Sequence, residues 1–392
     1  MIKAVNVNTF YYRGNISKKR NVTFKGFNNI ANDVMVITGK ETKAKIFARE
    51  IEEEAVEQIK QLCDMPIFKN AKIRIMPDVS AGNNCVVGFT AKLSPEKIKE
   101  LPPSIIGNDI GCGVLMVKTE AKTESLDLPA IDNFIRTIMP TNWKLRPEMP
   151  VELKQDIKTS CNLYGRDENK VYKQAGTLGN GNHFIEIDSD TDGNLYLAIH
   201  TGSRQFGSYI KEYYEKLHAE NMQCSDMNYA DAVSMAQKYA KFNRECIATM
   251  ILNKFKIKPF MQFDCPHNYI SEKGMVHKGS IDASLGKPVL IPLNMRDGMI
   301  IGKGKGNPDW NCSAPHGSGR KMSRYEARQN ISLNEYIDSM QGIYSTCVGK
   351  RSIDESPAAY KDSNNTADII KNTIDIEAMI KPIYNFKKVS GK

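Results

Sequence analysis

Hydrophobic and polar residues alternate near the start of the chain and then change to a helical spacing. The alternation within residues 1–40 has the two-residue period of β-strands and predicts short strands there. The positions that carry it are Val5, Val7, Phe10, Val34, Val36 and Thr38. From Ala44 to Cys63 the apolar residues recur at steps of four and three, which predicts a helix. Its inner face would consist of Phe47, Ile51, Ala55, Ile59 and Leu62.

Further along the chain, apolar runs alternate with polar, glycine-containing loops. Strands are expected at Ile73–Asp78, Cys85–Phe89, Leu195–His200 and in the two arms of residues 288–301, which a loop at 294–298 would join. Helices are expected at Phe206–Met222, at Tyr229–Phe255 and in a region reaching Met340, where Met322, Tyr325 and Ile331 have inner-face spacing. No repeat or change of composition divides the sequence, so we expect one domain over residues 1–392.

Composition and charge narrow the class of protein. The 392 residues are 41% hydrophobic and 25% charged, which is ordinary for a globular protein, and no apolar run approaches the ~18 residues of a membrane span. The formal charge of +9 favours a polyanionic partner. The N-terminus lacks the apolar stretch of a signal peptide. Nine cysteines without paired spacing indicate reduced thiols, and therefore a cytoplasmic protein.

One glycine-rich segment places a carboxylate and a thiol close together. Asp109 and Cys112 are three positions apart, among glycines at 107, 111 and 113. A buried cysteine is usually a small hydrophobic residue, but an aspartate beside it would be costly to bury without a partner. A metal ion bound by both side chains accounts better for the pair.

Histidines supply further candidate metal ligands. His183 and His200 both lie where a predicted strand meets a glycine loop, and His267 lies in a loop beside Asn268. Of the remaining histidines, His218 falls on a Lys- and Glu-rich helix and is expected to be solvated, whereas His277 stays undecided. Mixed O, S and N ligands favour zinc by softness, although they also suit manganese where triphosphate oxygens must bind.

The segment Asn311–Arg324 differs from the other histidine loops. His316 lies between a proline and a Gly-Ser-Gly run, with Arg320 and Arg324 behind it. We expect a tight loop at a helix N-terminus, where amide and guanidinium groups converge on an anion and the imidazole could attack phosphorus. The alternative is a surface turn with an inert histidine. Asp78, at a strand end, is either a turn-former or a functional carboxylate.

Five of these segments resemble the signature motifs of the RtcB RNA-splicing ligases and occur in the family's order. They are Gly107–Gly113, Gly176–Phe184, His200–Arg204, His316–Arg324 and Asp354–Asp362. The resemblance extends from about Ile46 to Lys387. It implies an α+β fold, with one large domain of mixed β-sheets flanked by helices around an open, basic active-site cleft.

The activity that the resemblance implies is GTP- and manganese-dependent ligation of RNA. An RNA 3′-phosphate or 2′,3′-cyclic phosphate would be joined to a 5′-hydroxyl, in tRNA splicing or RNA repair, and an archease-type activator is a possible partner. The histidine that becomes guanylylated would be His316, with Asp78 as the second catalytic residue. Two Mn²⁺ ions would be bound by Asp109, Cys112, His183, His200 and His267.

The nucleotide would contact residues from several motifs. By resemblance these are Asn182, Phe184, Glu186, Asn268, Pro292, Asn294, Met295, Gly317, Ser318, Gly319, Tyr360 and Lys387. The sequence also departs from the family in three places. Ser80–Asn84 stands where the family usually has a His-Pro-Gly-Lys-Gly-like run, and Pro292–Arg296 stands for Pro-Gly-Ser-Met-Gly. Lys387 and Lys388 replace a final Lys-Gly. The substrate can therefore differ from that of typical members.

Three other functions fit part of the same pattern. A divergent member could cap nucleic-acid 3′-phosphates with a guanylyl group without joining them. A metal-dependent phosphoesterase would use the metal loops with water and would not need His316. An RNA-binding module would need basic and aromatic residues rather than a set of Asp, Cys and His.

Overall fold

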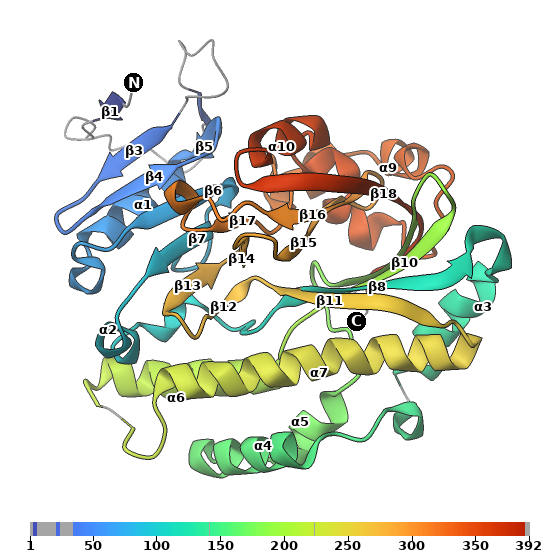
Figure 1. Cartoon of the computed structure of the whole chain (residues 1–392), viewed down its shortest axis with the longest axis horizontal. Coiled ribbons are helices and arrows are strands. Elements are labelled where there is room, and N and C mark those ends of the chain that lie inside the picture. Colours follow the sequence, from blue (N-terminus) through green and yellow to red (C-terminus); the bar gives the residue numbers. More distant parts are fainter. Residues whose placement is uncertain (1–2, 6–20, 24–33, 141, 223, 389–392) are drawn as a thin grey trace.

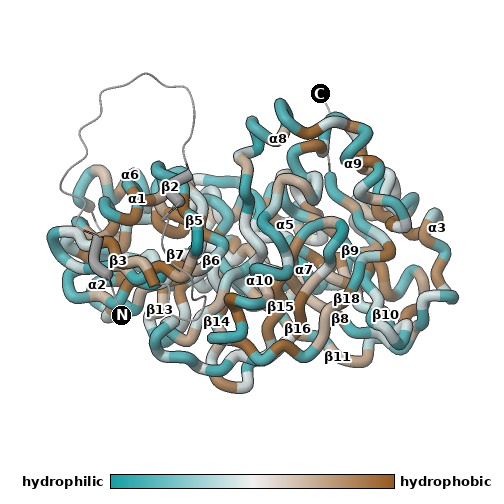
Figure 2. Tube along the Cα trace, turned by 90° about the horizontal axis from the view of Figure 1, so that it is seen from above, coloured by the Kyte–Doolittle hydropathy of each residue, from teal (hydrophilic) through white to brown (hydrophobic). Residues whose placement is uncertain are grey.

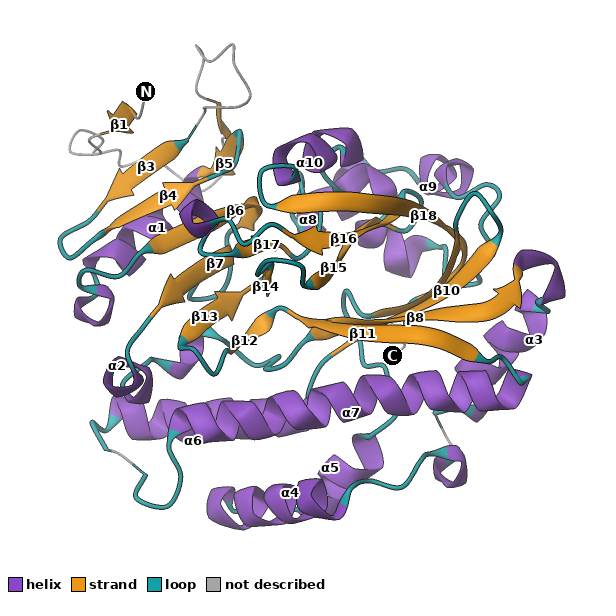
Figure 3. Cartoon of the chain, in the orientation of Figure 1, coloured by secondary structure: helices purple, strands orange, loops and turns teal. Residues whose placement is uncertain are grey.

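The computed structural model describes residues 3–5, 21–23, 34–140, 142–222 and 224–388. Two seven-stranded sheets lie side by side, and helices cover them (Figures 1 and 3). The predicted mixture of β-sheets and flanking helices is therefore confirmed. Among the described residues, no helix combines the length and apolar composition needed to cross a membrane.

The first sheet has the strand order β1-β3-β4-β6-β7-β13-β12 and contains both parallel and antiparallel pairs. Its strands are β1 Lys3–Val5, β3 Met35–Thr38, β4 Lys43–Ile46, β6 Ile73–Ser80, β7 Val87–Lys92, β13 Met275–Lys278 and β12 Asn268–Ile270. β6 contributes a candidate catalytic residue, because Asp78 lies near the end of this strand. Short strands β2 (Asn21–Thr23) and β5 (Glu50–Glu52) pair separately.

The second sheet has the order β11-β8-β10-β9-β18-β16-β15, and each neighbouring pair is antiparallel. Its strands are β11 Pro259–Pro266, β8 Gly113–Lys122, β10 Asn194–Thr201, β9 Phe184–Ser189, β18 Ile374–Phe386, β16 Gly298–Gly304 and β15 Pro288–Asn294. Hydrophobic segments along β15 and β16 are visible in Figure 2, and their side chains fill a local core.

Helix α7 (Tyr229–Phe255) runs beneath both sheets (Figure 1). Val233 and Tyr239, in its first half, belong to the core of the first sheet, whereas Ile247 and Ile251 belong to the core of the second sheet. The other helices are α1 Glu53–Asp64, α2 Pro95–Lys99, α3 Leu128–Asn133, α4 Val151–Tyr164, α5 Glu168–Gln174, α6 Arg204–Ala219, α8 Arg324–Asn330, α9 Leu333–Ser339 and α10 Ser363–Ile370.

His316 directly follows a strand of a small two-stranded sheet, which lies beside the first large sheet. β14 (Ser280–Asp282) pairs with β17 (Ser313–Pro315), which ends just before His316. Upstream of β17, the Trp310 ring stacks on Phe47 with centroids 3.9 Å apart. This contact anchors the β17 segment beside β6, so the His316 loop lies next to Asp78.

Two helix predictions need correction. The helix predicted from Ala44 begins only at Glu53, because residues 43–46 pair as β4 and Phe47 is held against Trp310. The region reaching Met340 is divided into α8 and α9, and Tyr325 is 73% exposed rather than inward-facing. Helices at 206–222 and 229–255 and the strand pair at 288–301 are confirmed, as are strands at Val5 and Val36. Val7 and Phe10 lie outside the described residues.

Gly111 should tolerate no side chain, because α7 packs directly behind it. Its φ is +72°, and an added Cβ would lie 2.9 Å from both the Ala240 Cβ and the Gln237 Cα. We predict that Gly111→Ala lowers the free energy of unfolding by about 2 kcal/mol or more in urea denaturation. The control is Gly165→Ala, where φ is +61° and the added Cβ meets nothing within 4 Å. An equal loss in both variants would contradict the packing argument.

Candidate functional site

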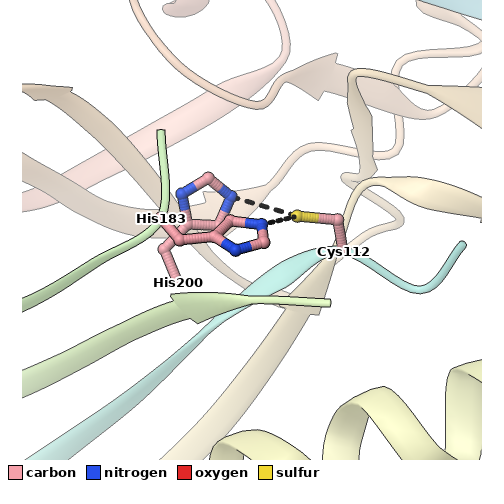
Figure 4. Close-up of side chains that lie close together, drawn as sticks. All are labelled: Cys112, His183 and His200. Atoms are coloured by element: carbon pink, nitrogen blue, oxygen red, sulfur yellow. Dashed lines mark hydrogen bonds between the residues drawn. The ribbon is translucent and has the colours of Figure 1, made fainter. Parts of the chain in front are cut away.

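Cys112, His183 and His200 form a buried cluster that could hold a metal ion (Figure 4). The Cys112 Sγ lies 3.5 Å from the His183 Nε2 and 3.3 Å from the His200 Nε2. Cys112 immediately precedes β8, His183 immediately precedes β9, and His200 lies within β10. Because β10 pairs with both β8 and β9, the sheet brings the three side chains together. The predicted convergence of these three residues is therefore present.

Backbone carbonyls orient both imidazole rings of the cluster. The His183 Nδ1 lies 2.9 Å from the Leu178 carbonyl oxygen, and the His200 Nδ1 lies 3.2 Å from that of Asn182. A carbonyl only accepts hydrogen bonds, so each Nδ1 carries the proton and each Nε2 presents a lone pair toward the sulfur. Burial holds the pKa of His200 well below its usual value, which keeps this ring neutral.

Asp109 and His267, the other two predicted ligands, lie beside the cluster. The Asp109 Oδ2 is 2.9 Å from the His183 Nε2. The His267 ring centroid is 5.1 Å from that of His200, and its backbone N–H donates to the Cys112 carbonyl at 2.8 Å. The full set offers one thiol, three imidazoles and one carboxylate, which suits a borderline divalent metal.

Arg244 on α7 fixes the loops that carry the cluster. Its guanidinium is fully buried and donates to both carboxylate oxygens of Asp264 on β11, at 2.6 and 2.7 Å. The remaining nitrogen donates to the carbonyls of Gly111 at 2.8 Å and Thr201 at 2.7 Å. These carbonyls belong to the residues next to Cys112 and His200. No local pattern indicates this role, because Arg244 lies within an ordinary helical sequence.

Asn243, the neighbour of Arg244, holds the third loop. Its amide nitrogen donates to the carbonyls of Thr177 at 3.1 Å and Gly202 at 3.2 Å, and its oxygen accepts the Thr177 N–H at 3.1 Å. The Thr177 segment continues into Leu178, whose carbonyl orients His183. Two adjacent residues of α7 therefore position all three loops of the metal cluster.

His316 and Asp78 form a second chemical pair close to the cluster. The His316 Nδ1 lies 2.6 Å from the Asp78 Oδ2, and the His316 backbone N–H donates to the same oxygen at 3.1 Å. Asp78 is buried, whereas the His316 side chain is 20% exposed. The carboxylate accepts a hydrogen bond from the Nδ1–H group, so Nε2 is the ring nitrogen available for reaction. The centroid of His316 is 4.6 Å from that of His267.

The expected helix N-terminus at His316 is wrong. α8 begins only at Arg324, and a capping box formed by Ser323 and Glu326 satisfies its first turn. The neighbouring arginines are paired with carboxylates of the protein, and both also line a cavity together with His316. Arg324 forms ion pairs with Asp354 at 2.6 Å and with Glu355, and Arg320 lies 3.7 Å from Glu355.

Glu355 is the centre of a buried charged network that includes Tyr360, Lys387 and Arg324. It accepts hydrogen bonds from the Lys387 Nζ at 2.6 Å and the Tyr360 hydroxyl at 2.8 Å. Burial raises the pKa of Glu355, but Lys387 and Arg324 outweigh it and bring the pKa to about 2. The network fixes Tyr360 and Lys387, which were both predicted as nucleotide contacts. The role of Glu355 itself was missed, although it lies in a recognised motif.

One cavity includes all but four of the predicted site residues in its lining. The four exceptions are Asp109, Cys112, His183 and Asn268. Asn268 instead donates to the Asp109 carbonyl at 3.2 Å, so it supports the metal loop. The lining residues include Asp78, Asn182, Phe184, Glu186, His200, His267, Pro292, Asn294, Met295, His316, Gly317, Ser318, Gly319, Tyr360 and Lys387. The candidate metal cluster, His316 and the predicted nucleotide contacts therefore adjoin a common cavity.

Asn385 also lines this cavity and was not predicted. Its side-chain nitrogen donates to Glu186, whose carboxyl group adjoins Asp188 in the buried face of β9. Burial raises the pKa of both carboxyl groups, and the Glu186 charge raises that of Asp188 further. Of the two other histidines, His218 is exposed as predicted, and His277 is buried against Tyr269 with ring centroids 4.6 Å apart.

The buried thiol and imidazoles are a candidate metal site, and they lie close to a histidine that contacts a buried carboxylate, as in the active site of an enzyme. The chain belongs to the RtcB family, whose model, described as tRNA-splicing ligase RtcB, matches residues 58–163 and 154–388. The RNA-splicing ligase RtcB of Escherichia coli (strain K12) is 29% identical over 369 residues, which span 80% of this chain and 88% of that protein.

Archaeal proteins are similar at a comparable distance. The tRNA-splicing ligase RtcB of Methanococcus maripaludis is 26% identical over 442 residues, covering 86% of this chain and 92% of that protein. That of Aeropyrum pernix is 25% identical over 403 residues, covering 75% and 83%. Similarity at this level over most of the chain makes this protein a divergent member of the family.

Removal of the Cys112 sulfur should weaken metal binding without unfolding the protein. We predict that Cys112→Ala loses at least tenfold in affinity for Mn²⁺ and Zn²⁺, measured by titration calorimetry. Circular dichroism should give an unchanged spectrum. Cys161→Ala is the matched control, because Cys161 is also buried but lies on the inner face of α4, outside the cluster. Unaltered metal affinity in Cys112→Ala would exclude the cluster as a metal site.

Proposed function

We propose that this protein is a GTP-dependent RNA ligase that joins an RNA 3′-phosphate or 2′,3′-cyclic phosphate to a 5′-hydroxyl. The observation that carries the proposal is the 2.6 Å contact between the His316 Nδ1 and the Asp78 Oδ2, in the cavity that His200 and His267 also line. A histidine held in this way has one free ring nitrogen beside a candidate metal site. Membership of the RtcB family supports the same reaction.

The first proposed step transfers GMP to His316. The Nε2 lone pair attacks the α-phosphorus of GTP, a P–N bond forms, and the P–O bond to the β-phosphate breaks to release pyrophosphate. The ring becomes cationic in this step. Asp78 stabilises that charge and keeps the proton on Nδ1, so the ring cannot turn its other nitrogen toward the phosphate.

Two further transfers would complete the joining. Where the end is a 2′,3′-cyclic phosphate, water first opens it to the 3′-phosphate by breaking the bond between phosphorus and the 2′-oxygen. An oxygen of the RNA 3′-phosphate then attacks the phosphorus of the histidine adduct, which breaks the P–N bond and gives an RNA end activated with GMP. The 5′-hydroxyl of the second RNA then attacks the 3′-phosphorus and expels GMP. Each step replaces one good leaving group with another, so a difficult condensation of phosphate and hydroxyl is avoided.

The residues around His183 fit a divalent metal ion by their chemistry. We propose two Mn²⁺ ions held by Asp109, Cys112, His183, His200 and His267, with the thiolate as a shared ligand. Bound metal would offset the negative charge that grows on the phosphoryl group during transfer. The carbonyls of Leu178 and Asn182 hold the imidazoles in the tautomer that such binding needs.

Other parts of the proposal concern the whole chain. We propose one ligase domain over residues 1–392, because strands of both large sheets contribute to the same cavity. Stacking and polar contacts to GTP are proposed for the lining residues Phe184, Tyr360 and Lys387. A cytoplasmic location and an archease-type activator stay predictions.

The adduct on His316 separates this function from a phosphoesterase, which needs no covalent nucleotide. We predict that protein incubated with α-labelled GTP and Mn²⁺ carries one labelled GMP, and that His316→Ala carries none. The P–N bond should be cleaved by acid and resist alkali. His218→Ala is the control, because that histidine is exposed on α6. A label that persists in His316→Ala, or that survives acid, would assign another nucleophile.

The ends of the RNA distinguish this reaction from conventional ligation and from capping. We predict joining of 3′-phosphate to 5′-hydroxyl ends and no joining of 3′-hydroxyl to 5′-phosphate ends, followed on denaturing gels with labelled RNA. Activation of the 3′-phosphate requires a phosphate oxygen as nucleophile, and a 3′-hydroxyl end has none. Accumulation of GMP-capped RNA that is never joined would instead identify a capping enzyme.

A further inference from the structure

Asn385 leaves an acceptor without a hydrogen-bond partner in the wall of the cavity. The residue lies on β18 directly opposite Glu186 on β9, and its side-chain nitrogen donates to the Glu186 carboxyl group. That bond fixes the orientation of the amide. The Asn385 Oδ1 is then buried and has no partner among the described residues, although Asn385 lines the cavity. Buried acceptors of this kind are rare, because desolvation without a hydrogen bond is costly.

The chemistry of this part of the wall selects which part of a nucleotide it can accept. Glu186 and Asn385 together present carboxyl and amide oxygens, and an anionic phosphate would be repelled by them. A group with N–H donors would bind instead. The rings of Phe184 and Tyr360 line the same cavity and suit a planar heterocycle. The base of a nucleotide therefore fits here, with its phosphates directed toward His316.

Two neighbouring acceptors also distinguish one purine from another. Guanine presents two adjacent donors on one edge, the N1–H and the exocyclic 2-amino group. Hypoxanthine has the N1–H but lacks the amino group, and adenine presents an acceptor at N1 beside its 6-amino donor. Only guanine satisfies both oxygens at once.

We propose that Asn385 is a specificity-determining residue that reads the 2-amino group of guanine. Its Oδ1 accepts a hydrogen bond from that amine while Glu186 accepts one from N1–H. The inference rests on the proposed use of GTP, and it adds to the site a residue that lies outside the recognised motifs.

A purely structural role for Asn385 makes a different prediction. If its amide only supported Glu186, a substitution would weaken all purine nucleotides to the same extent. If Oδ1 binds the amine, the loss would fall on guanine alone. The ratio of affinities for GDP and IDP therefore tests the proposal, because the two ligands differ only in the 2-amino group.

The experiment measures dissociation constants of GDP and IDP for the full chain with Mn²⁺, by titration calorimetry. We expect GDP to bind about tenfold more tightly than IDP to the wild type, and about equally in Asn385→Leu. Asn385→Ala provides a second variant with less bulk, and thermal unfolding checks that both are folded. Asn253→Leu is the matched control, since Asn253 is exposed on α7. The control should keep the wild-type ratio.

Three outcomes would overturn the inference. They are equal binding of GDP and IDP by the wild type, an unchanged ratio in both Asn385 variants, and no binding of either nucleotide. None of these readouts depends on covalent chemistry. Selective GDP binding without a labelled His316 would contradict the proposed ligase mechanism while supporting the role of Asn385. A labelled His316 with equal GDP and IDP affinities would support the proposed ligase mechanism and contradict the role of Asn385.

Discussion

The buried ion pair between Arg244 and Asp264 sets the positions of the loops on which the site depends. Arg244 is paired through two nitrogens, and its third nitrogen holds the carbonyls of Gly111 and Thr201. Replacement of either charged partner would leave the other buried alone, which is far more costly than losing both. The main effect of the pair is therefore to fix the positions of the loops that carry Cys112 and His200. Together with the pairing of β8 and β10, it places Cys112 and His200 at contact distance.

The other half of the site is held by a different network with the same logic. Asp78 orients His316, and Glu355 gathers Lys387, Tyr360 and Arg324 around one buried carboxylate. In both networks a buried carboxylate holds its partners through hydrogen bonds, so His316, Lys387 and Tyr360 cannot change rotamer freely. The proposed nucleophile His316 and the side chains of the cavity wall are therefore held in place by contacts within the protein.

The sequence patterns predicted the residues of the metal cluster, but they did not predict the residues that hold the site in place. Cys112, His183 and His200 lie in glycine loops at strand ends, where a polar residue has few structural reasons to occur, and the structure joins them as expected. Arg244 and Asn385 lie inside a regular helix and strand, so nothing in the local pattern separates them from scaffold residues.

The errors in secondary structure have the same origin. The helical spacing predicted from Ala44 holds only from Glu53 onward, because the pairing of β4 with β3 and β6 overrides it in residues 43–46. Arg320 and Arg324 looked like anion ligands because Asp354 and Glu355, which neutralise them, are about thirty residues away. Contacts between distant segments, which a local pattern does not contain, decided each of these cases.

The order in which the chain is synthesised gives the two halves of the site different histories. Cys112 meets histidines only 71 and 88 positions away, whereas His316 and Asp78 are 238 positions apart. Synthesis from the N-terminus therefore produces the residues of the thiol–imidazole cluster and of α7 before residue 316 exists. A chain still shorter than 316 residues already contains all five candidate metal ligands and lacks the proposed nucleophile, so the candidate metal site is synthesised first.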